Sequence, residues 1–289
     1  MNTTHTERIE VRIVVVVLLL AVVSVGAQEK AAPQLVSIGT HRLDAIVAGR
    51  GSVPVVFEGG LGNPLDTWQH VWPQVAASAP VVVYSRAGLG RSEPGSVKHT
   101  AHEAIEDLHK LLAAVHATPP YVLVGASYGG MLVRLYTSMY REEVVGLVIV
   151  EGVHEQQVQR FGELDPTYPA AFRASFEDIL RQEPTGAEAD EIRETMRIQA
   201  AGAVEGMKPL PDIPIAVLTS MRADPQAPFV NGTPRGHAAW RAMHDEWFQQ
   251  STNGIHIETS RSGHHIQDEE PQLVVDAIAF VRHRLGLTP

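Results

Sequence analysis

Cysteine is absent from this sequence of 289 residues. Its absence excludes disulfide bonds, thiol nucleophiles and cysteine-ligated zinc. A basic run is also absent: 33 aspartate and glutamate residues against 23 lysine and arginine residues give a formal net charge of −10. Because nucleic-acid binding depends on clustered positive charge, we expect no nucleic-acid partner.

The sequence also lacks a hydrophobic run long enough for a comfortable membrane span. Its longest apolar run, Ile13 to Val25, is interrupted by one serine, follows Arg8 and Arg12 and leads into small residues ending at Ala27. A basic flank, a short apolar core and small residues are typical of a signal peptide. We predict a signal peptide over residues 1–27, cleaved after Ala27, with an uncleaved anchor as the alternative. The mature protein would then be secreted or periplasmic, without stable membrane association.

Short apolar segments alternate with amphipathic helical segments along most of the chain. The predicted strands cover residues 35–38, 41–48, 53–57, 81–84, 121–124, 144–150, 215–219 and 255–259, and the predicted helices cover residues 66–77, 102–116, 131–140, 236–250 and 272–285. The first two strands read as an antiparallel hairpin. The continuous apolar strands that follow predict a parallel sheet covered by helices on both faces. A chain of this length can bury a sizeable core without a disulfide or metal.

Residues 152–212 interrupt this alternation. The segment is polar and has helical patches at residues 155–161, 170–181 and 187–200. A plain connection of this length is uncommon inside a compact domain. We predict a helical cap inserted over the carboxyl ends of the strands, where such sheets bind ligands. The core would then consist of residues 28–151 and 213–289.

The motif Gly125-Ala126-Ser127-Tyr128-Gly129 lies between a predicted strand and a predicted helix. This context is typical of a nucleophile elbow, a tight turn that lifts a serine hydroxyl clear of the sheet. The two glycines leave room where a side chain would collide with a neighbouring element. Ser127 would also stand at a helix N-terminus, which favours negative charge. We interpret Ser127 as a nucleophile; an ordinary Gly-rich turn is the alternative.

Several motifs that follow one another in the sequence resemble the α/β-hydrolase superfamily, and the resemblance covers nearly everything after the leader. They are the serine elbow, the Gly-Gly-Leu-Gly turn at residues 59–62, the Arg-Ala-Gly-Leu-Gly-Arg-Ser segment at residues 86–92, Gly263-His264 and Glu270-Pro271. The resemblance implies a mostly parallel, eight-stranded sheet with a helical cap. It also implies that His264 is the catalytic base and that His265 packs under the loop. Ser85 stands where the family often has aspartate, which would weaken a local ion pair.

The acid that orients the histidine has two candidates. The family most often places it after the strand that follows the cap, which here gives Asp224, and some members place it one strand earlier, which gives Glu151. A carboxylate at the end of an apolar strand is costly unless it is paired, and this favours a role for Glu151. Asp224 lies in an Asp-Pro turn, where aspartate is ordinary. We prefer Glu151 and keep Asp224 as the alternative.

The resemblance also implies an oxyanion hole formed by the backbone N–H groups of Leu61 and Tyr128. The full set predicts acyl transfer to water through Ser127, His264 and a carboxylate, without a metal or organic cofactor. Carboxylic-ester hydrolysis of a small molecule is our first choice, and amide, thioester, lactone or carbon–carbon bond hydrolysis remain open. The competing hypothesis is a non-catalytic receptor that uses the capped pocket for binding. The sequence gives no indication of the oligomeric state.

Overall fold

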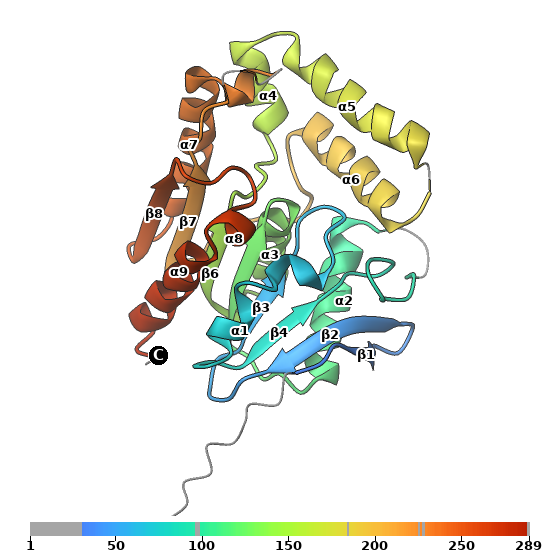
Figure 1. Cartoon of the computed structure of the whole chain (residues 1–289), viewed down its shortest axis with the longest axis vertical. Helices are drawn as coiled ribbons and strands as arrows, with labels where there is room; N and C mark the ends of the chain where they lie inside the picture. Colours follow the sequence, from blue (N-terminus) through green and yellow to red (C-terminus); the bar gives the residue numbers. More distant parts are fainter. Residues whose placement is uncertain (1–30, 96–98, 184, 225, 227–228, 288–289) are drawn as a thin grey trace, which may run out of the picture. The chain divides into compact units, whose positions relative to one another are not determined.

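The computed structural model describes residues 31–287 apart from 96–98, 184, 225 and 227–228 (Figure 1). The predicted signal peptide, residues 1–27, lies outside the described residues. In the part of the chain that the structure describes, no helix is both long and apolar enough to cross a membrane.

The described residues form an eight-stranded sheet with the strand order β1-β2-β4-β3-β5-β6-β7-β8. The strands are β1 (Gln34–Ser37), β2 (Arg42–Ala48), β3 (Val55–Glu58), β4 (Val81–Tyr84), β5 (Tyr121–Ala126), β6 (Val144–Val150), β7 (Ile215–Ser220) and β8 (Gly254–Thr259). Strand β2 pairs antiparallel with both β1 and β4, and every pair from β4 to β8 is parallel. The predicted fold class, a mostly parallel α/β sheet opened by a hairpin, is confirmed.

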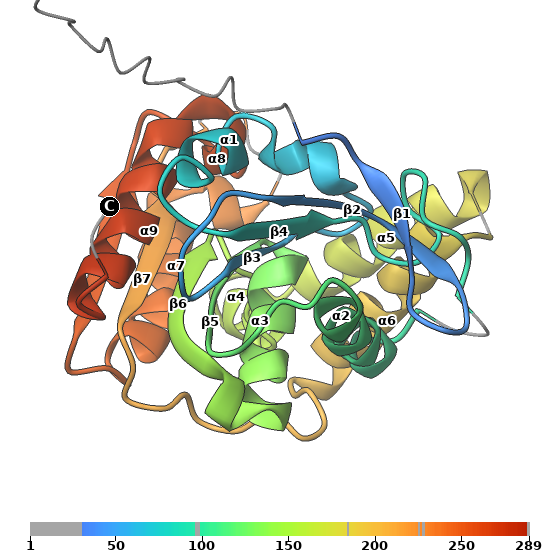
Figure 2. The same cartoon turned by 90° about the horizontal axis from the view of Figure 1, so that it is seen from below.

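Helices cover both faces of this sheet, as the edge-on view in Figure 2 shows. They are α1 (Trp72–Val75), α2 (Ala101–Ala114), α3 (Tyr128–Met139), α7 (Pro234–Phe248), α8 (Ile266–Glu269) and α9 (Pro271–Arg284). One core cluster joins the sheet to α2, α3 and Trp247 of α7. The other joins the opposite face to α1 and α9. The parallel strands are apolar on both sides because each side is covered.

The prediction of a single helix over residues 66–77 was wrong in its extent. The chain there forms a 3₁₀ turn, η1 (Leu65–Trp68), and then the short helix α1. Pro73 lies in the first turn of α1, where its missing N–H has no helical partner to lose. The proline therefore begins a new helix and does not continue the preceding one.

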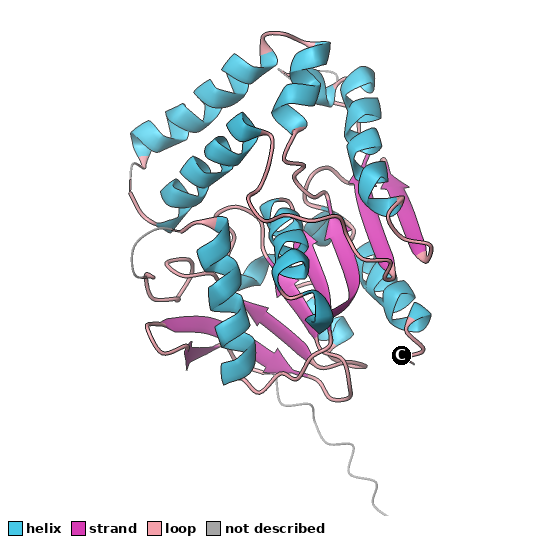
Figure 3. Ribbon diagram, turned by 180° about the vertical axis from the view of Figure 1, so that it is seen from behind, coloured by secondary structure: helices cyan, strands magenta, loops and turns pink. Residues whose placement is uncertain are grey.

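Residues 152–212, the helical insertion, contain α4 (Gln157–Leu164), α5 (Tyr168–Gln182) and α6 (Ala187–Ala201) between β6 and β7. Figures 1 and 3 show these helices beyond one end of the sheet. Glu191 of α6 contacts the segments that follow β3 and β4, through Gly62 and Arg86. The insertion therefore packs against the carboxyl ends of the parallel strands.

Candidate active site

Ser127 lies in a strained turn between β5 and α3. Its backbone has φ 53° and ψ −118°, a conformation that residues with a side chain rarely adopt. A Cβ atom on Gly125 would lie 2.3 Å from the carbonyl oxygen of Gly129, and one on Gly129 would lie 2.4 Å from the carbonyl oxygen of Glu58. Only glycine fits at either position, so the motif is the sequence requirement of this turn.

His264 reaches Ser127 from the loop after β8. Its Nε2 atom lies 2.9 Å from Ser127 Oγ. The loop is supported by Arg222, whose guanidinium packs against Gly263, and by Glu269, which pairs with Arg222 and accepts the Gly263 N–H. The side chain of His264 is 47% exposed. The His264 ring is therefore held by its loop while it stays open to solvent.

Glu151 lies on the other side of the His264 ring, where its Oε2 atom is 3.2 Å from Nδ1. Glu151 is 5% exposed, and its carboxylate also accepts hydrogen bonds from the Ser220 N–H and from Nε1 of Trp240. Glu151 has a backbone φ of 48°, which bends the chain sharply at the end of β6. The Ser220 N–H and the Trp240 indole thus orient one buried carboxylate toward the imidazole.

The other two predicted candidates lie elsewhere. Asp224 is exposed and its Oδ1 atom accepts the Gln226 N–H, so its carboxylate caps a turn and does not contact His264. His265 is also exposed and contacts His264 edge-on, with the ring centroids 5.5 Å apart. The expectation that His265 packs under the loop was therefore wrong. Ile266 and Gln267 are the residues that turn inward at this point of the chain.

The backbone N–H groups of Leu61 and Tyr128 are placed by the turn after β3 and by the first residue of α3. Among the residues that the structure describes, no acceptor is bonded to either N–H group. Gly60 brings the turn close to the nucleophile, because a Cβ atom there would lie 3.4 Å from Ser127 Cβ and 2.7 Å from Asn63 Oδ1. Two free donors beside the nucleophile are the arrangement that an oxyanion requires.

A buried ionic network holds the turn at residues 59–62. Arg86 donates to the carbonyl oxygens of Gly59 and Gly60 and pairs with Glu58 and with Glu191 of α6. Burial alone would lower the pKa of Arg86, but the two carboxylates outweigh it and raise that pKa well above its ordinary value. Glu191 in turn accepts the Gly62 N–H. The guanidinium therefore stays charged and fixes the backbone of the predicted oxyanion turn.

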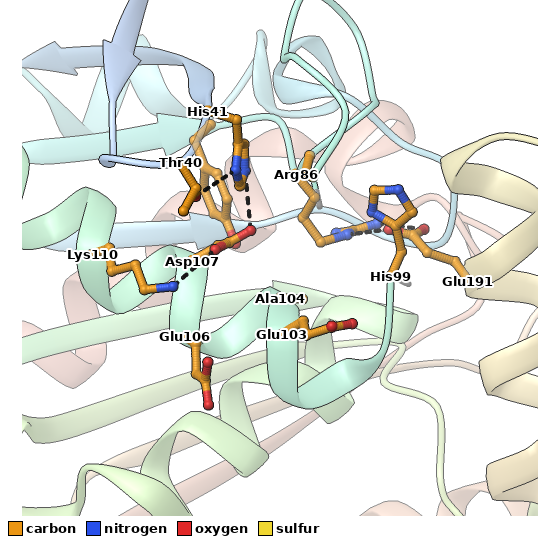
Figure 4. A pocket seen from close by; sticks show the side chains of 13 residues that line it. Thr40, His41, Arg86, His99, Glu103, Ala104, Glu106, Asp107, Lys110 and Glu191 are labelled. Carbon is orange, nitrogen blue, oxygen red and sulfur yellow. Dashed lines mark hydrogen bonds and ion pairs between the residues drawn. The ribbon is translucent and has the colours of Figure 1, made fainter. Parts of the chain in front are cut away.

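A cavity of about 150 Å³ lies on the far side of this network. Arg86, Glu191, His41 and Asp107 are among its lining residues, and His41 pairs with Asp107 across it (Figure 4). In the described part of the chain, no three histidine, aspartate or glutamate side chains are grouped so that they could hold a metal ion. The cavity is polar, and its charged groups are mostly paired with one another.

Sequence reasoning missed the residues that support Glu151 and the turn at residues 59–62. Glu58 offered a signal, because it ends an apolar strand in the same way as Glu151. Trp240 and Glu191 offered none, since each lies on a predicted helix with no motif around it. Their roles depend on how α7 and α6 pack, which local patterns do not reveal.

Comparisons with known proteins agree with this architecture. The family described as alpha/beta hydrolase fold matches residues 53–185. The uncharacterized protein YqjL of Bacillus subtilis (strain 168) is 26% identical over 80% of this chain and 83% of its own length. A thermophilic esterase from Thermogutta terrifontis has a TM-score of 0.62 at 18% identity, over 88% of this chain and 99% of that one. The 2-hydroxy-6-oxo-6-phenylhexa-2,4-dienoate hydrolase of Rhodococcus sp. strain RHA1 has a TM-score of 0.60 at 17% identity, over 89% of this chain and 99% of that one.

These matches and the eight-stranded sheet define the class of protein by its fold: the chain has the α/β-hydrolase fold. This fold, together with esterase and hydrolase neighbours, supports hydrolase activity. The structural neighbours share the fold but are named for different activities, so the reaction of this chain has to be argued from its own residues.

Proposed function

We propose that the protein is a serine hydrolase that cleaves a carboxylic ester, or a related acyl bond, of a small molecule. The observation that carries the proposal is the continuous contact from Ser127 through His264 to Glu151, with distances of 2.9 and 3.2 Å. A nucleophile, a base and an orienting carboxylate in this order are the working parts of acyl transfer. The free N–H groups of Leu61 and Tyr128 complete the set.

In the first half of the reaction, Ser127 Oγ attacks the substrate carbonyl carbon while its proton passes to His264 Nε2. The carbonyl electrons move to oxygen, and the N–H groups of Leu61 and Tyr128 stabilise the resulting oxyanion. When the oxyanion collapses, the bond to the alcohol breaks and His264 returns the proton to the departing oxygen. Glu151 keeps the Nδ1 proton of His264 in place and stabilises the imidazolium. The product of this half is an acyl-serine and a free alcohol.

In the second half, water replaces the alcohol. His264 accepts a proton from water as the water oxygen attacks the acyl carbon, and the same two N–H groups hold the second oxyanion. The bond to Ser127 Oγ then breaks, the serine recovers its proton from His264, and a carboxylic acid leaves. These steps use only the residues of the chain.

We propose further that the helical insertion, residues 152–212, acts as a cap that shapes the substrate pocket, and that the mature protein is exported after removal of residues 1–27. The contacts of Glu191 with the oxyanion turn support the first proposal. The second rests on the sequence pattern of the leader. Mass spectrometry of protein recovered outside the cytoplasm should give an N-terminus at Gln28, and a chain that still begins at Met1 would contradict cleavage.

Hydrolysis of p-nitrophenyl esters of increasing acyl length tests the reaction. We expect turnover by the wild type and a loss of about 10⁶-fold in kcat for Ser127→Ala, the scale seen when a catalytic serine is removed. Parallel assays with an anilide, a thioester and a lactone identify the preferred bond. Tight ligand binding without turnover, equal in wild type and Ser127→Ala, would instead favour a receptor.

A further inference from the structure

A chain of buried hydrogen bonds begins at the residue after Glu151. The carbonyl oxygen of Gly152 lies 2.9 Å from Nε2 of His244 on α7. Nδ1 of the same ring lies 2.5 Å from the hydroxyl of Thr219 on β7. Both His244 and Thr219 are fully buried. The backbone behind the proposed acid is therefore attached to two other elements of the core.

The chain continues from Thr219 toward the edge of the sheet. The Thr219 hydroxyl lies 2.7 Å from Nε2 of His256 on β8, and Nδ1 of His256 lies 2.7 Å from Oδ1 of Asp245 on α7. Arg241 pairs with Asp245 and with Glu258. These three charged residues lie next to the outer end of the hydrogen-bonded series. The outer end of the series, at Asp245, is thus anchored by charged groups, and the inner end, at His244, contacts the carbonyl oxygen of Gly152.

The hydrogen bonds of this chain have only one consistent direction. A carbonyl oxygen accepts, so Nε2 of His244 carries a proton, and burial lowers the pKa of His244 to about 4, which keeps the ring neutral. Its Nδ1 atom must then accept the one proton of the Thr219 hydroxyl. The hydroxyl oxygen is left to accept from Nε2–H of His256.

His256 connects the Thr219 hydroxyl to a carboxylate. Its Nε2 atom contacts Thr219, and its Nδ1 atom faces the carboxylate of Asp245. Both ring nitrogens of His256 are therefore engaged. The ring centroid of His256 lies 6.4 Å from that of His244.

His244 also controls the indole that binds the proposed acid. Trp240, one helical turn earlier on α7, packs against the His244 ring with the centroids 4.4 Å apart. Its Nε1 atom lies 3.1 and 3.2 Å from the two carboxylate oxygens of Glu151. His244 therefore fixes the chain after Glu151 through Gly152 and the carboxylate of Glu151 through Trp240.

We propose that Thr219 and His244 are positioning residues for Glu151, anchored by the hydrogen bond between His256 and Asp245. The proposal rests on the proposed function, in which Glu151 orients His264. Glu151 needs such support because its φ of 48° is a strained conformation that its surroundings must maintain. A relaxed turn at this point would move the carboxylate away from Nδ1 of His264.

The pair Thr219→Val and Thr219→Ser tests this role. Valine keeps the volume and removes the hydroxyl that joins the two histidines, whereas serine keeps the hydroxyl. We expect Thr219→Val to lower kcat on a p-nitrophenyl ester by about 10- to 100-fold with KM within about twofold, because small misplacements of catalytic groups cost this much. Thr219→Ser should restore most of the loss.

Long-range ¹H–¹⁵N spectra of histidine-labelled protein give a readout that does not depend on turnover. In the wild type we expect His264 to carry its proton on Nδ1. In Thr219→Val the Nε2–H form of His264 should increase, and Thr219→Ser should match the wild type. Glu151→Gln serves as the reference for a ring that has lost its orienting carboxylate.

The two hypotheses fail in different ways. If the wild type hydrolyses no ester but the His264 tautomer still depends on Thr219, the proposed reaction is wrong and the positioning role stands. If Thr219→Val keeps the wild-type kcat and tautomer and only unfolds at lower urea concentration, the hydrogen-bonded chain is structural and our inference is overturned.

Discussion

At the scale of single residues, the carboxylate of Glu151 is the most informative side chain to change. Glu151→Gln keeps the volume of the side chain but allows His264 to adopt the wrong tautomer. The same kind of change lowers kcat by about 10⁴-fold in serine proteases, and we expect a loss of that order here. Steady-state kinetics on one p-nitrophenyl ester measure it.

Asp224→Asn is the matched control, because Asp224 is exposed and accepts only the Gln226 N–H. Its kcat should stay within about twofold of the wild type, as expected for a surface change away from the chemistry. Both variants should be compared at equal thermal stability. An inactive Asp224→Asn beside a nearly normal Glu151→Gln would move the acid to the loop after β7.

The two adjacent histidines offer a second comparison at this scale. His264→Ala removes the ring that contacts Ser127, so kcat should fall by about 10⁶-fold, as for loss of a catalytic histidine in subtilisin. His265→Ala removes an exposed ring and should leave kcat within about threefold and the unfolding free energy within about 0.5 kcal/mol. The reverse ranking of two folded variants would mean that the wrong histidine has been assigned as the base.

At the scale of elements, a buried ion pair joins α3 to the segment that leads into α4. Arg134 donates two hydrogen bonds to Glu155, at 2.8 and 3.1 Å, and stacks over Trp247. Burial raises the pKa of Glu155, but Arg134 outweighs it and lowers the pKa to about 2. Because the folded pKa is depressed, the stabilisation is present above the unfolded pKa and is lost as pH falls through the folded value.

We therefore expect Glu155 to contribute about 3 kcal/mol to the free energy of unfolding at neutral pH, from a shift of 4.5 to about 2. This contribution should disappear between about pH 4.5 and pH 2. Urea unfolding of wild type and Glu155→Gln across this range measures it. Glu93→Gln, from the exposed pair with Arg42, is the control and should change little. Parallel pH curves for wild type and Glu155→Gln would contradict the assignment.

The helix α5 carries an aromatic stripe in which Phe172 contacts both Tyr168 and Phe176. If the helical insertion shapes the pocket, Phe172→Ala should raise KM for a bulky ester by about tenfold and leave kcat on a small acetyl ester unchanged, because it removes binding and not chemistry. Arg173→Ala, an exposed neighbour on the same helix, is the control. Identical constants for every ester in the two variants would show that α5 does not contact substrate.

At the scale of the whole molecule, the sheet was predictable because its strands are continuous apolar runs. The strands at residues 81–84 and 144–150 were predicted with the bounds that the structure has, since every local signal there agrees. The segment 66–77 failed because apolar spacing favoured a helix while Pro73 required a new start. Local pattern decides an element only where such signals do not conflict.

The site was predictable to the extent that a single motif defines it. Ser127 and His264 each follow a strand and have a glycine next to them or two residues away, and these are visible in sequence. The choice between Glu151 and Asp224 could not be made from the sequence, because it depends on which strand end approaches His264 across the sheet. Trp240, which binds Glu151 from 89 positions further along the chain, could not be found without the packing of α7.

The bond between Arg86 and Glu191 limits how this protein could exchange its helical insertion for another. Glu191 is the only part of the insertion described here as pairing with that buried cation, and it also holds the N–H of Gly62. A chimaera with a foreign insertion that lacks a carboxylate at this place would leave Arg86 paired with Glu58 alone, and its Nε–H and the Gly62 N–H would lose their acceptor, at a cost of about 1–3 kcal/mol for each buried donor left unsatisfied. The insertion is therefore not freely interchangeable, because a transplanted insertion must bring one acidic residue to this position.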